Sequence, residues 1–276
     1  MRLALAATVA LWSVPALAQP ALASGAPSGR PPVNEGWSVT VGAAPVVSPA
    51  WQGSKDYVFS IYPDLRVNYG DLFFASIPDG VGFNAVNADG WRAGPIAKLR
   101  FGRDEDGRGS PFAITGSSDA LIGLGDVGAT AEVGAFVEKR FGARQQWRGR
   151  VETRRGFGGH EGTVGDLSLS YQARAGRTIL NIGPRATVAS KDFTRTFFGI
   201  DAAQSLASGL APYEPKGGLV SYGLGGSLIH PLDRHSAITG FSSLERLGGV
   251  AKDSPLVAEQ GRALQFTAGI GYGYRF

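Results

Sequence analysis

The stretch LQFTAGIGYGYRF, residues 264–276, alternates between two kinds of residue along its whole length. The even-numbered positions are apolar or aromatic, and the odd-numbered positions are small or polar. A period of two indicates a β-strand with two unlike faces. Because free chain ends fray, an aromatic strand in the last residues of the sequence indicates that these side chains have a specific function.

The same alternation recurs from end to end of the chain. The clear segments are 37–43, 57–69, 91–101, 127–138, 167–172, 180–188 and 220–228, and the weaker ones are 71–87, 147–153, 191–200 and 235–246. We interpret 71–87 as one long, kinked strand. With 264–276 these make about twelve segments of roughly ten residues, the length that crosses a bilayer as a tilted strand. Longer connectors lie at 48–56, 102–126, 201–216 and 247–261, and only 102–126 has a mixed pattern that could include a short helix.

The N-terminal residues predict export. Residues 1–18, MRLALAATVALWSVPALA, have one arginine, a short apolar run and a small-residue cleavage site, which is typical of a secretory signal peptide. The run is too short for a transmembrane anchor. A second cleavage site after Ala23 is an alternative. Residues 19–36 have no hydrophobic period and indicate a flexible leader, which leaves 37–276 as the folded domain.

Composition argues against several classes of function. The net charge of +4, which falls to +3 without Arg2, and its even spread do not indicate a nucleic-acid partner. The chain has no cysteine and three scattered histidines, so we expect no metal site. The GLGDVG stretch at 123–128 matches a dinucleotide motif, but an alternating strand follows it instead of a helix. We therefore expect no cofactor.

Two architectures fit the alternation, a soluble β-sandwich and a membrane barrel. The polar face favours an antiparallel transmembrane β-barrel of about 12 strands, with 10 as the alternative, because its mixed charges can pair across an enclosed lumen. The expected lumen charges are Arg66, Arg92, Arg100, Glu132, Glu138, Arg148, Arg150, Glu152, Arg185 and Arg275, and Lys98 and Arg154 have the same parity. Aromatic residues near the strand ends fit the girdles of such barrels.

Few residues suggest catalysis. His160 lies near Glu161 and Asp166 and could form an acid–base pair with one of them. No nucleophile accompanies this group, so we favour a glycine-rich turn with a local role for the histidine. The basic pairs 139–140 and 154–155 at expected strand ends could touch lipopolysaccharide phosphates or peptidoglycan, although solvated charge is the commoner explanation.

Several blocks are similar to one known family. The chain resembles the MipA/OmpV outer-membrane proteins, named for a protein that interacts with the lytic transglycosylase MltA. The matching stretches are 49–70, 123–142, 156–171, 181–219 and 252–276, of which TRTFFGIDAAQSLASGL (194–210), DSPLV and the terminal YRF are the most specific. The resemblance implies a barrel in the Gram-negative outer membrane. It also implies a scaffold that links a lytic transglycosylase and a peptidoglycan synthase, and it supplies no catalytic residues.

Four functions remain open at this point. The first is the scaffold, for which irregular connectors such as 102–126 could face the periplasm. The others are a small-solute pore, a surface adhesin or antigen, and an outer-membrane hydrolase that uses His160. In the class of outer-membrane barrels the last strand carries an assembly signal, which here would be Tyr272, Tyr274 and Phe276, facing lipid and read by the barrel assembly machinery.

Overall fold

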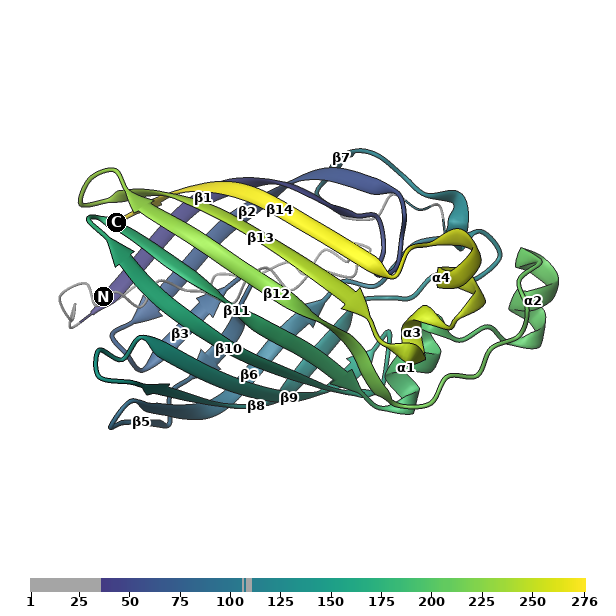
Figure 1. The fold of residues 1–276 in the computed structure, drawn as a ribbon, viewed down its shortest axis with the longest axis horizontal. Helices are drawn as coiled ribbons and strands as arrows, with labels where there is room; N and C mark the ends of the chain where they lie inside the picture. The colour runs from purple at the N-terminus through teal and green to yellow at the C-terminus, as the bar shows by residue number, and fades with distance from the viewer. Residues whose placement is uncertain (1–35, 106, 108–110) are drawn as a thin grey trace, which may run out of the picture.

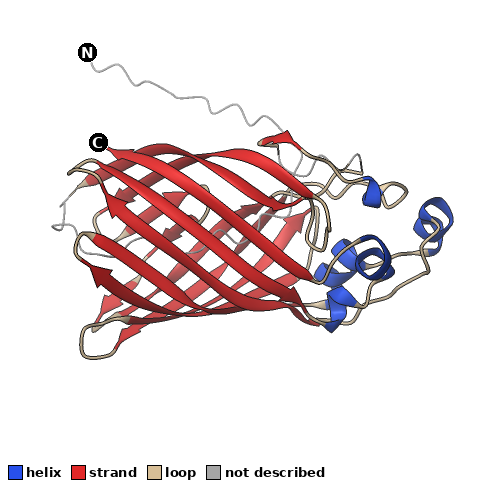
Figure 2. Cartoon of the chain, turned by 45° about the horizontal axis from the view of Figure 1, so that its top comes forward, coloured by secondary structure: helices blue, strands red, loops and turns tan. Residues whose placement is uncertain are grey.

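The strands close into one antiparallel barrel in a computed structural model that describes residues 36–105, 107 and 111–276 (Figures 1 and 2). β1 pairs with β2 on one side and with β14 on the other, which joins the two ends of the sheet. The barrel has 12 strands, as the period of two predicts. The expected signal peptide and residues 19–35 of the expected leader lie outside the described residues.

The barrel wall consists of nine long strands, one of ten residues and two short ones. The wall strands are β1 (Trp37–Pro49), β2 (Tyr57–Tyr69), β3 (Phe73–Ser76), β4 (Gly80–Phe83), β6 (Trp91–Arg100), β8 (Thr130–Phe141), β9 (Trp147–Gly158), β10 (Thr163–Ala175), β11 (Thr178–Ala189), β12 (Gly218–Pro231), β13 (Ser236–Leu247) and β14 (Leu264–Arg275). Two further strands, β5 (Val86–Ala88) and β7 (Ala113–Thr115), pair with β6 and β2. The weak pattern at 235–246 is confirmed as β13.

The segment 71–87 is not one kinked strand. It forms the hairpin β3–β4, and β5 then continues against β6. A tight turn at 77–79 reverses the chain, since the Asp79 amide donates to the Ser76 hydroxyl (3.0 Å) and that hydroxyl donates to the Asp79 carboxylate (3.0 Å). Gly80 completes the turn with a φ of +80°, a conformation that favours glycine.

Four helices and a 3-10 turn lie at one end of the barrel, at the right of Figure 1. They are α1 (Lys191–Phe198), α2 (Ala202–Ser208), α3 (Gly249–Lys252), α4 (Pro255–Gln260) and the 3-10 turn Asp119–Leu121. The prediction of a strand over 191–200 is wrong, because Phe193 and Phe197 are four residues apart and face inward together from a helix. The reading that helical structure is confined to 102–126 is wrong as well.

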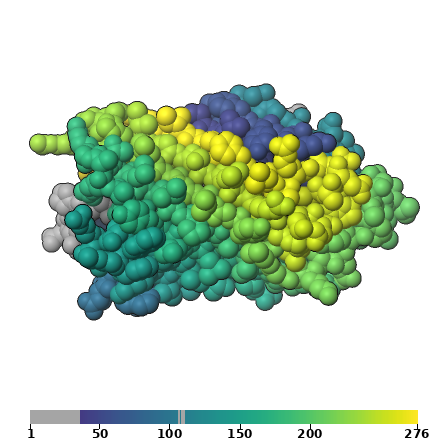
Figure 3. Space-filling model, viewed as in Figure 1, coloured from purple at the N-terminus to yellow at the C-terminus, as the bar shows by residue number. Residues whose placement is uncertain are grey.

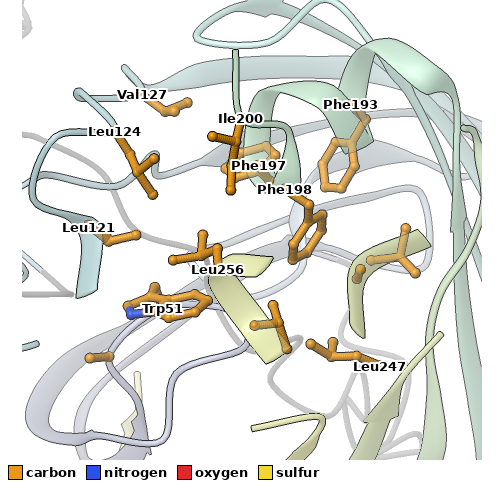
Figure 4. Close-up of a cluster of buried hydrophobic side chains, with 14 of the residues drawn as sticks. Trp51, Leu121, Leu124, Val127, Phe193, Phe197, Phe198, Ile200, Leu247 and Leu256 are labelled. Carbon is orange, nitrogen blue, oxygen red and sulfur yellow. The ribbon is translucent and has the colours of Figure 1, made fainter. Parts of the chain in front are cut away.

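The helices and long loops pack into a buried apolar cluster that we call the cap. Its residues come from loop segments far apart in the sequence and from the adjoining strand ends (Figure 4). The fully buried members include Val164, Phe193, Phe198, Val220, Leu247, Ala251 and Leu256. Segments 190–217 and 248–263 cover this end of the barrel in the space-filling view (Figure 3). No helix within the described part of the chain is long and apolar enough to cross a membrane.

The opposite end carries short turns, at 70–72, 142–146, 176–177 and 232–235, and we call it the turn end. The first described strand begins there, and the amide of Phe276 donates to the carbonyl of Val39 at the same end (2.9 Å). Short turns face the periplasm in outer-membrane barrels. By that rule the cap faces outward, and the described residues of the segment 102–126 lie with the cap and not on the periplasmic side.

Candidate functional site: the barrel lumen

Three glutamates define one wall of the lumen. Glu132 and Glu138 of β8 and Glu152 of β9 are each 4% exposed or less. They face inward because the even-numbered positions of β8 and β9 point into the lumen. Their odd-numbered neighbours Val133, Val137 and Val151 face outward and are about half exposed. A buried carboxylate is costly unless cations and hydrogen bonds surround it, so the partners of these groups determine the stability of the wall.

Glu132 lies nearest the cap and accepts from three side chains. Arg100 of β6 donates to one carboxylate oxygen, and Arg154 of β9 donates to the other through Nε (2.9 Å). The third contact is His160 Nε2, 3.0 Å from Oε1. Arg154 is only 3% exposed and also donates to Glu152 and to Asp166 of β10. One arginine therefore joins three carboxylates from three adjacent strands.

Glu152 and Glu138 continue the network toward the turn end. Glu152 accepts from Lys98 Nζ (2.7 Å) and from Arg150 Nε (2.7 Å), as well as from Arg154. Glu138 accepts from Arg148 (2.9 Å) and Arg150 (3.1 Å). Glu132 and Glu152 are thus each held by three donor groups, and Glu138 is held by two with the Arg140 guanidinium 3.6 Å away. We call strands β6, β8, β9 and β10 with these side chains the charged wall. Networks of this kind fix side chains in place only when every member is satisfied.

The facing wall, formed by β11 to β14, is nearly neutral. Its lumen side chains are mostly small and polar, namely Asn181, Ser221, Ser227, Ser243, Gln265 and Thr267. One ion pair crosses it, between Arg185 and Glu245 (3.5 Å). The Arg185 guanidinium lies over Gly225, where a Cβ atom would come within 2.8 Å of it. Glycine on this face therefore makes room for a long side chain.

A cavity of about 190 Å³ lies between the two walls. It begins beneath the cap, where Trp51 and Phe193 line it, and extends along the lumen to Arg148 and Asn181, close to the turn end. The cap covers its other end with packed apolar side chains. The cavity is therefore a polar, charged space with an apolar lid.

His160 is buried where the charged wall meets the cap. Its Nδ1 accepts the amide of Gly162 (3.2 Å), so Nε2 carries the hydrogen that faces Glu132. Its ring contacts Phe193 (5.0 Å) and Phe197 (5.7 Å) edge to face. Both nitrogens are engaged, so this arrangement orients a neutral imidazole and fastens α1 to the wall.

The structure does not bring the expected acid–base group together. Asp166 lies in β10 and binds Arg154 and the Thr187 hydroxyl, whereas Glu161 is exposed. Within the described residues, the hydroxyl group that hydrogen-bonds to His160 is Thr130 Oγ1, which accepts its backbone amide (3.0 Å) and does not contact the ring nitrogens. Among the described residues no cluster of histidine, aspartate or glutamate could hold a metal ion.

A family comparison places this barrel among known proteins. The family model described as MltA-interacting protein MipA matches residues 41–276. The chain belongs to the MipA family. No curated protein matches it by sequence.

Several solved barrels are similar to this MipA-family chain in outline only. An outer membrane channel from Pseudomonas putida F1 is 15% identical with a TM-score of 0.46, covering 90% of this chain and 97% of that one. The NanC porin is 10% identical with a TM-score of 0.39, covering 86% and 98%. An anion-selective porin from Comamonas acidovorans is 12% identical with a TM-score of 0.32, covering 87% and 98%. None is similar enough to inform the function.

The remaining expected lumen charges lie apart from the network of this MipA-family barrel. Arg66 pairs with Asp64 (2.8 Å) and Asp79 (3.4 Å), and Arg92 pairs with Asp71 (3.1 Å). Arg275 lies at the turn end, on the odd-numbered face of β14 that points into the lumen. Its side chain makes no ion pair within the described residues.

The aromatic residues of β14 lie on its outer face. Tyr272, Tyr274 and Phe276 are 48%, 41% and 75% exposed. The rings of Tyr274 and Phe276 contact each other, with centroids 5.0 Å apart.

Two arginines matter more than the sequence analysis indicated. Arg154 has the parity of the lumen charges and also belongs to a basic pair at an expected strand end, and β9 runs on to Gly158 and buries it. Its carboxylate partners include residues of the neighbouring strands β8 and β10, so the pattern of β9 alone does not predict its central place in the network. Arg103 lies in the cap at 3% exposure, where it donates to the carbonyl of Phe197 (2.7 Å) and has no carboxylate partner among the described residues. Burial lowers the pKa of Arg103 to about 10. No local sequence pattern predicts its burial.

Proposed function

We propose that this protein is a non-enzymatic outer-membrane barrel, exported by the signal peptide 1–18, that serves as a scaffold for a lytic transglycosylase and a peptidoglycan synthase. The observation that carries the proposal is the match of a family named for its interaction with MltA over residues 41–276. The lumen supports a non-enzymatic role, because both ring nitrogens of His160 are engaged and none of the described residues places a nucleophile against that ring.

The closed end of the barrel favours a scaffold over a diffusion pore. A pore needs a continuous aqueous path, whereas the cap packs Trp51, Phe198 and Leu256 across one end and the charged wall fills part of the lumen. No steady single-channel conductance is therefore expected in planar bilayers.

A periplasmic partner would meet the turn end, given the orientation rule for short turns. Three exposed arginines lie on its turns, namely Arg144, Arg177 and Arg234, and Arg174 is exposed at the adjoining end of β10. The exposed acidic residues described at the same end are Asp71, Asp89 and Asp233, so arginines outnumber acidic residues there by one. Such a surface fits an acidic patch on a partner, and charge complementarity mainly raises the association rate.

The test is recovery of partners from solubilised envelope by the tagged barrel. We expect a lytic transglycosylase and a peptidoglycan synthase to be recovered, and the double variant Arg144→Glu/Arg177→Glu to recover less of them. The matched control reverses two exposed cations at the cap end, Lys216→Glu/Lys252→Glu, and leaves recovery unchanged. Recovery of neither enzyme, under conditions that retain other envelope complexes, contradicts the scaffold.

The last strand, β14, carries the expected signal for assembly of the barrel. β14 closes the sheet by pairing with β1, and its aromatic side chains face outward. We propose that Tyr272, Tyr274 and Phe276 form the signal read by the barrel assembly machinery. Deleting Phe276 should lower the amount of barrel in the outer membrane while secretion continues, and unchanged membrane levels contradict this role.

A further inference from the structure

We propose that the lumen cavity binds a small hydroxylated carboxylate, such as a sugar acid, which enters from the turn end. This inference concerns a solute site inside the barrel and does not depend on the scaffold. It rests on three properties of the cavity: its charge, its unused hydroxyl groups and its closure at the cap.

The cavity has an excess of positive charge. Six cationic side chains line it, namely Lys98, Arg100, Arg148, Arg150, Arg154 and Arg185, against four carboxylates, Glu132, Glu152, Asp166 and Glu245. Glu138 and Arg140, the next pair along the wall, cancel each other. Charges in a low-dielectric interior interact more strongly than in water, so an excess of two cations attracts an anion into this space.

Lys98 is the cation best placed to meet a solute. It projects from β6 into the cavity, and its only ion pair among the described residues is with Glu152. Arg150 and Arg154 also hold Glu152, so this carboxylate does not depend on the lysine. An ammonium group has three donor hydrogens, which leaves Lys98 able to donate to a second carboxylate.

The opposite side of the cavity offers hydroxyl groups. Ser243 of β13 and Thr267 of β14 line the cavity, and their hydroxyls have no hydrogen-bond partner among the described residues. A polar group that faces an enclosed space without a protein partner is available to water or to a ligand. Hydroxyls facing a cationic wall fit a solute with a carboxylate at one side and hydroxyl groups at the other.

The shape of the cavity supports retention of a solute over its passage. A volume of about 190 Å³ exceeds the roughly 150 Å³ of a protein cavity that holds a benzene molecule. The cap closes one end with apolar side chains, while Arg148 and Asn181 extend the polar lining toward the turn end. A solute of the size of a single sugar can therefore enter from the turn end and stop beneath Phe193.

The experiment measures binding by the purified, detergent-solubilised barrel in isothermal titration calorimetry at low salt. The probes are gluconate, acetate, glucose and glucosamine. We expect gluconate to bind more tightly than acetate, which lacks the hydroxyl chain, and more tightly than glucose and glucosamine, which lack the negative charge. Gluconate that binds no better than glucose, or no better than acetate, overturns the proposal.

Substitutions of lining residues test whether gluconate binds in this cavity. Lys98→Met should weaken gluconate binding about tenfold or more, because one hydrogen bond to a charged group contributes about 1.5–3 kcal/mol. The double variant Ser243→Ala/Thr267→Val should weaken gluconate and leave acetate unchanged. The matched control is Lys139→Met on the same side of the barrel, whose ammonium lies over the Trp91 ring outside the cavity.

Two readouts keep this test independent of folding and of the scaffold. A heat-dependent gel shift confirms that each variant is still a closed barrel, and only closed variants are compared. If Lys98→Met and Lys139→Met bind gluconate equally, the site is elsewhere and the proposal is wrong. Recovery of envelope enzymes by Lys98→Met should equal that of the parent, so failure of the scaffold would not affect the solute result.

Discussion

The barrel and the cap bury opposite kinds of side chain within one chain. On the barrel, Leu224 and Ile270 point away from the interior and are 56% and 55% exposed, and the interior holds Glu132 and Arg154. In the cap, Phe193 and Phe198 point inward and are 1% exposed or less. The difference follows from the solvent, because lipid surrounds the outer face of a membrane barrel and water surrounds a cap.

The two regions are therefore held together by different forces. The barrel depends on its backbone ladder and on a lumen network in which the three buried glutamates each have at least two cationic partners. The cap depends on apolar area removed from water. Removing one member of the network should disturb the whole barrel, whereas removing one apolar side chain from the cap should loosen the cap alone.

The largest effect is expected for Arg154→Met. This variant leaves Glu132, Glu152 and Asp166 without their shared partner in a buried site. Breaking a buried ion pair from one side costs about 3–5 kcal/mol. Urea unfolding of the barrel in lipid vesicles, followed by the heat-dependent gel shift, measures the loss of free energy.

The control for this variant is the next residue. Arg155 is exposed on the outer face of the same strand, so Arg155→Met removes the same charge without opening the network. Equal stability of the two variants would show that the buried network does not hold the charged wall.

A more local effect is expected for Phe198→Ala. The side chain is fully buried in the cap, and truncation of a buried phenylalanine costs about 3–5 kcal/mol in a rigid core. We expect this cost to open the cap and leave the barrel closed, so the variant should become sensitive to protease in segments 190–217 and 248–263 while its gel shift is unchanged. Leu206→Ala, at a position that is 90% exposed, is the control and should resist protease like the parent. Loss of the gel shift in Phe198→Ala would mean that cap and barrel unfold together.

The contrast between barrel and cap also explains how far sequence alone could predict this structure. On the barrel, parity decides which face a residue occupies, so a period of two was enough to place Glu138 and Arg150 in the lumen. Arg154 has the same parity, but its place in a basic pair at an expected strand end gave no sign that it is buried. The register between β8, β9 and β10, which brings three carboxylates to one arginine, depends on pairing that no single segment encodes.

The cap was the part that sequence could not predict. Its residues come from loops separated by up to about two hundred positions, and each loop contributes only a few of them. In KDFTRTFF (191–198) the aromatic residues fit both a strand and a short helix, and only the neighbours that bury Phe193 and Phe197 decide between the two. Arg103 is buried by the same long-range packing.

A moderate effect is expected for Gly225→Val on the neutral wall. A Cβ at this position would lie within 2.8 Å of the Arg185 guanidinium, so the arginine must move and its contact with Glu245 is disturbed. Overpacking of this kind costs about 1–3 kcal/mol. Gly240→Val is the matched control, since no atom lies within 4 Å of its Cβ position. Urea unfolding in vesicles should separate the two variants, and equal midpoints would mean that Arg185 moves aside without cost.

The smallest effect on stability is expected at the turn end. Its turns are surrounded by water, with neither lipid nor packed apolar side chains around them. In the turn at 232–235, Asp233 accepts from the Ser236 hydroxyl (2.6 Å) and from the amides of His235 (2.7 Å) and Ser236 (2.8 Å). These hydrogen bonds, led by the one from the Ser236 hydroxyl, lower the pKa of Asp233 to about 2.

The direction of the pH dependence follows from this shift. A carboxyl whose pKa is lower in the folded turn than its unfolded value of about 3.9 stabilises the turn above that pH, and the contribution disappears as the pH falls through the folded pKa. Amide hydrogen exchange of a peptide covering 232–236, corrected for its intrinsic pH dependence, should therefore lose protection only in strong acid. In Asp233→Ala the protection should be absent at every pH.

The turn at 142–146 is the internal control, because the Gln146 side chain that accepts the Arg144 amide (2.8 Å) does not titrate. Parallel loss of protection in both turns would mean that the barrel itself opens in acid, and that Asp233 does not set the response.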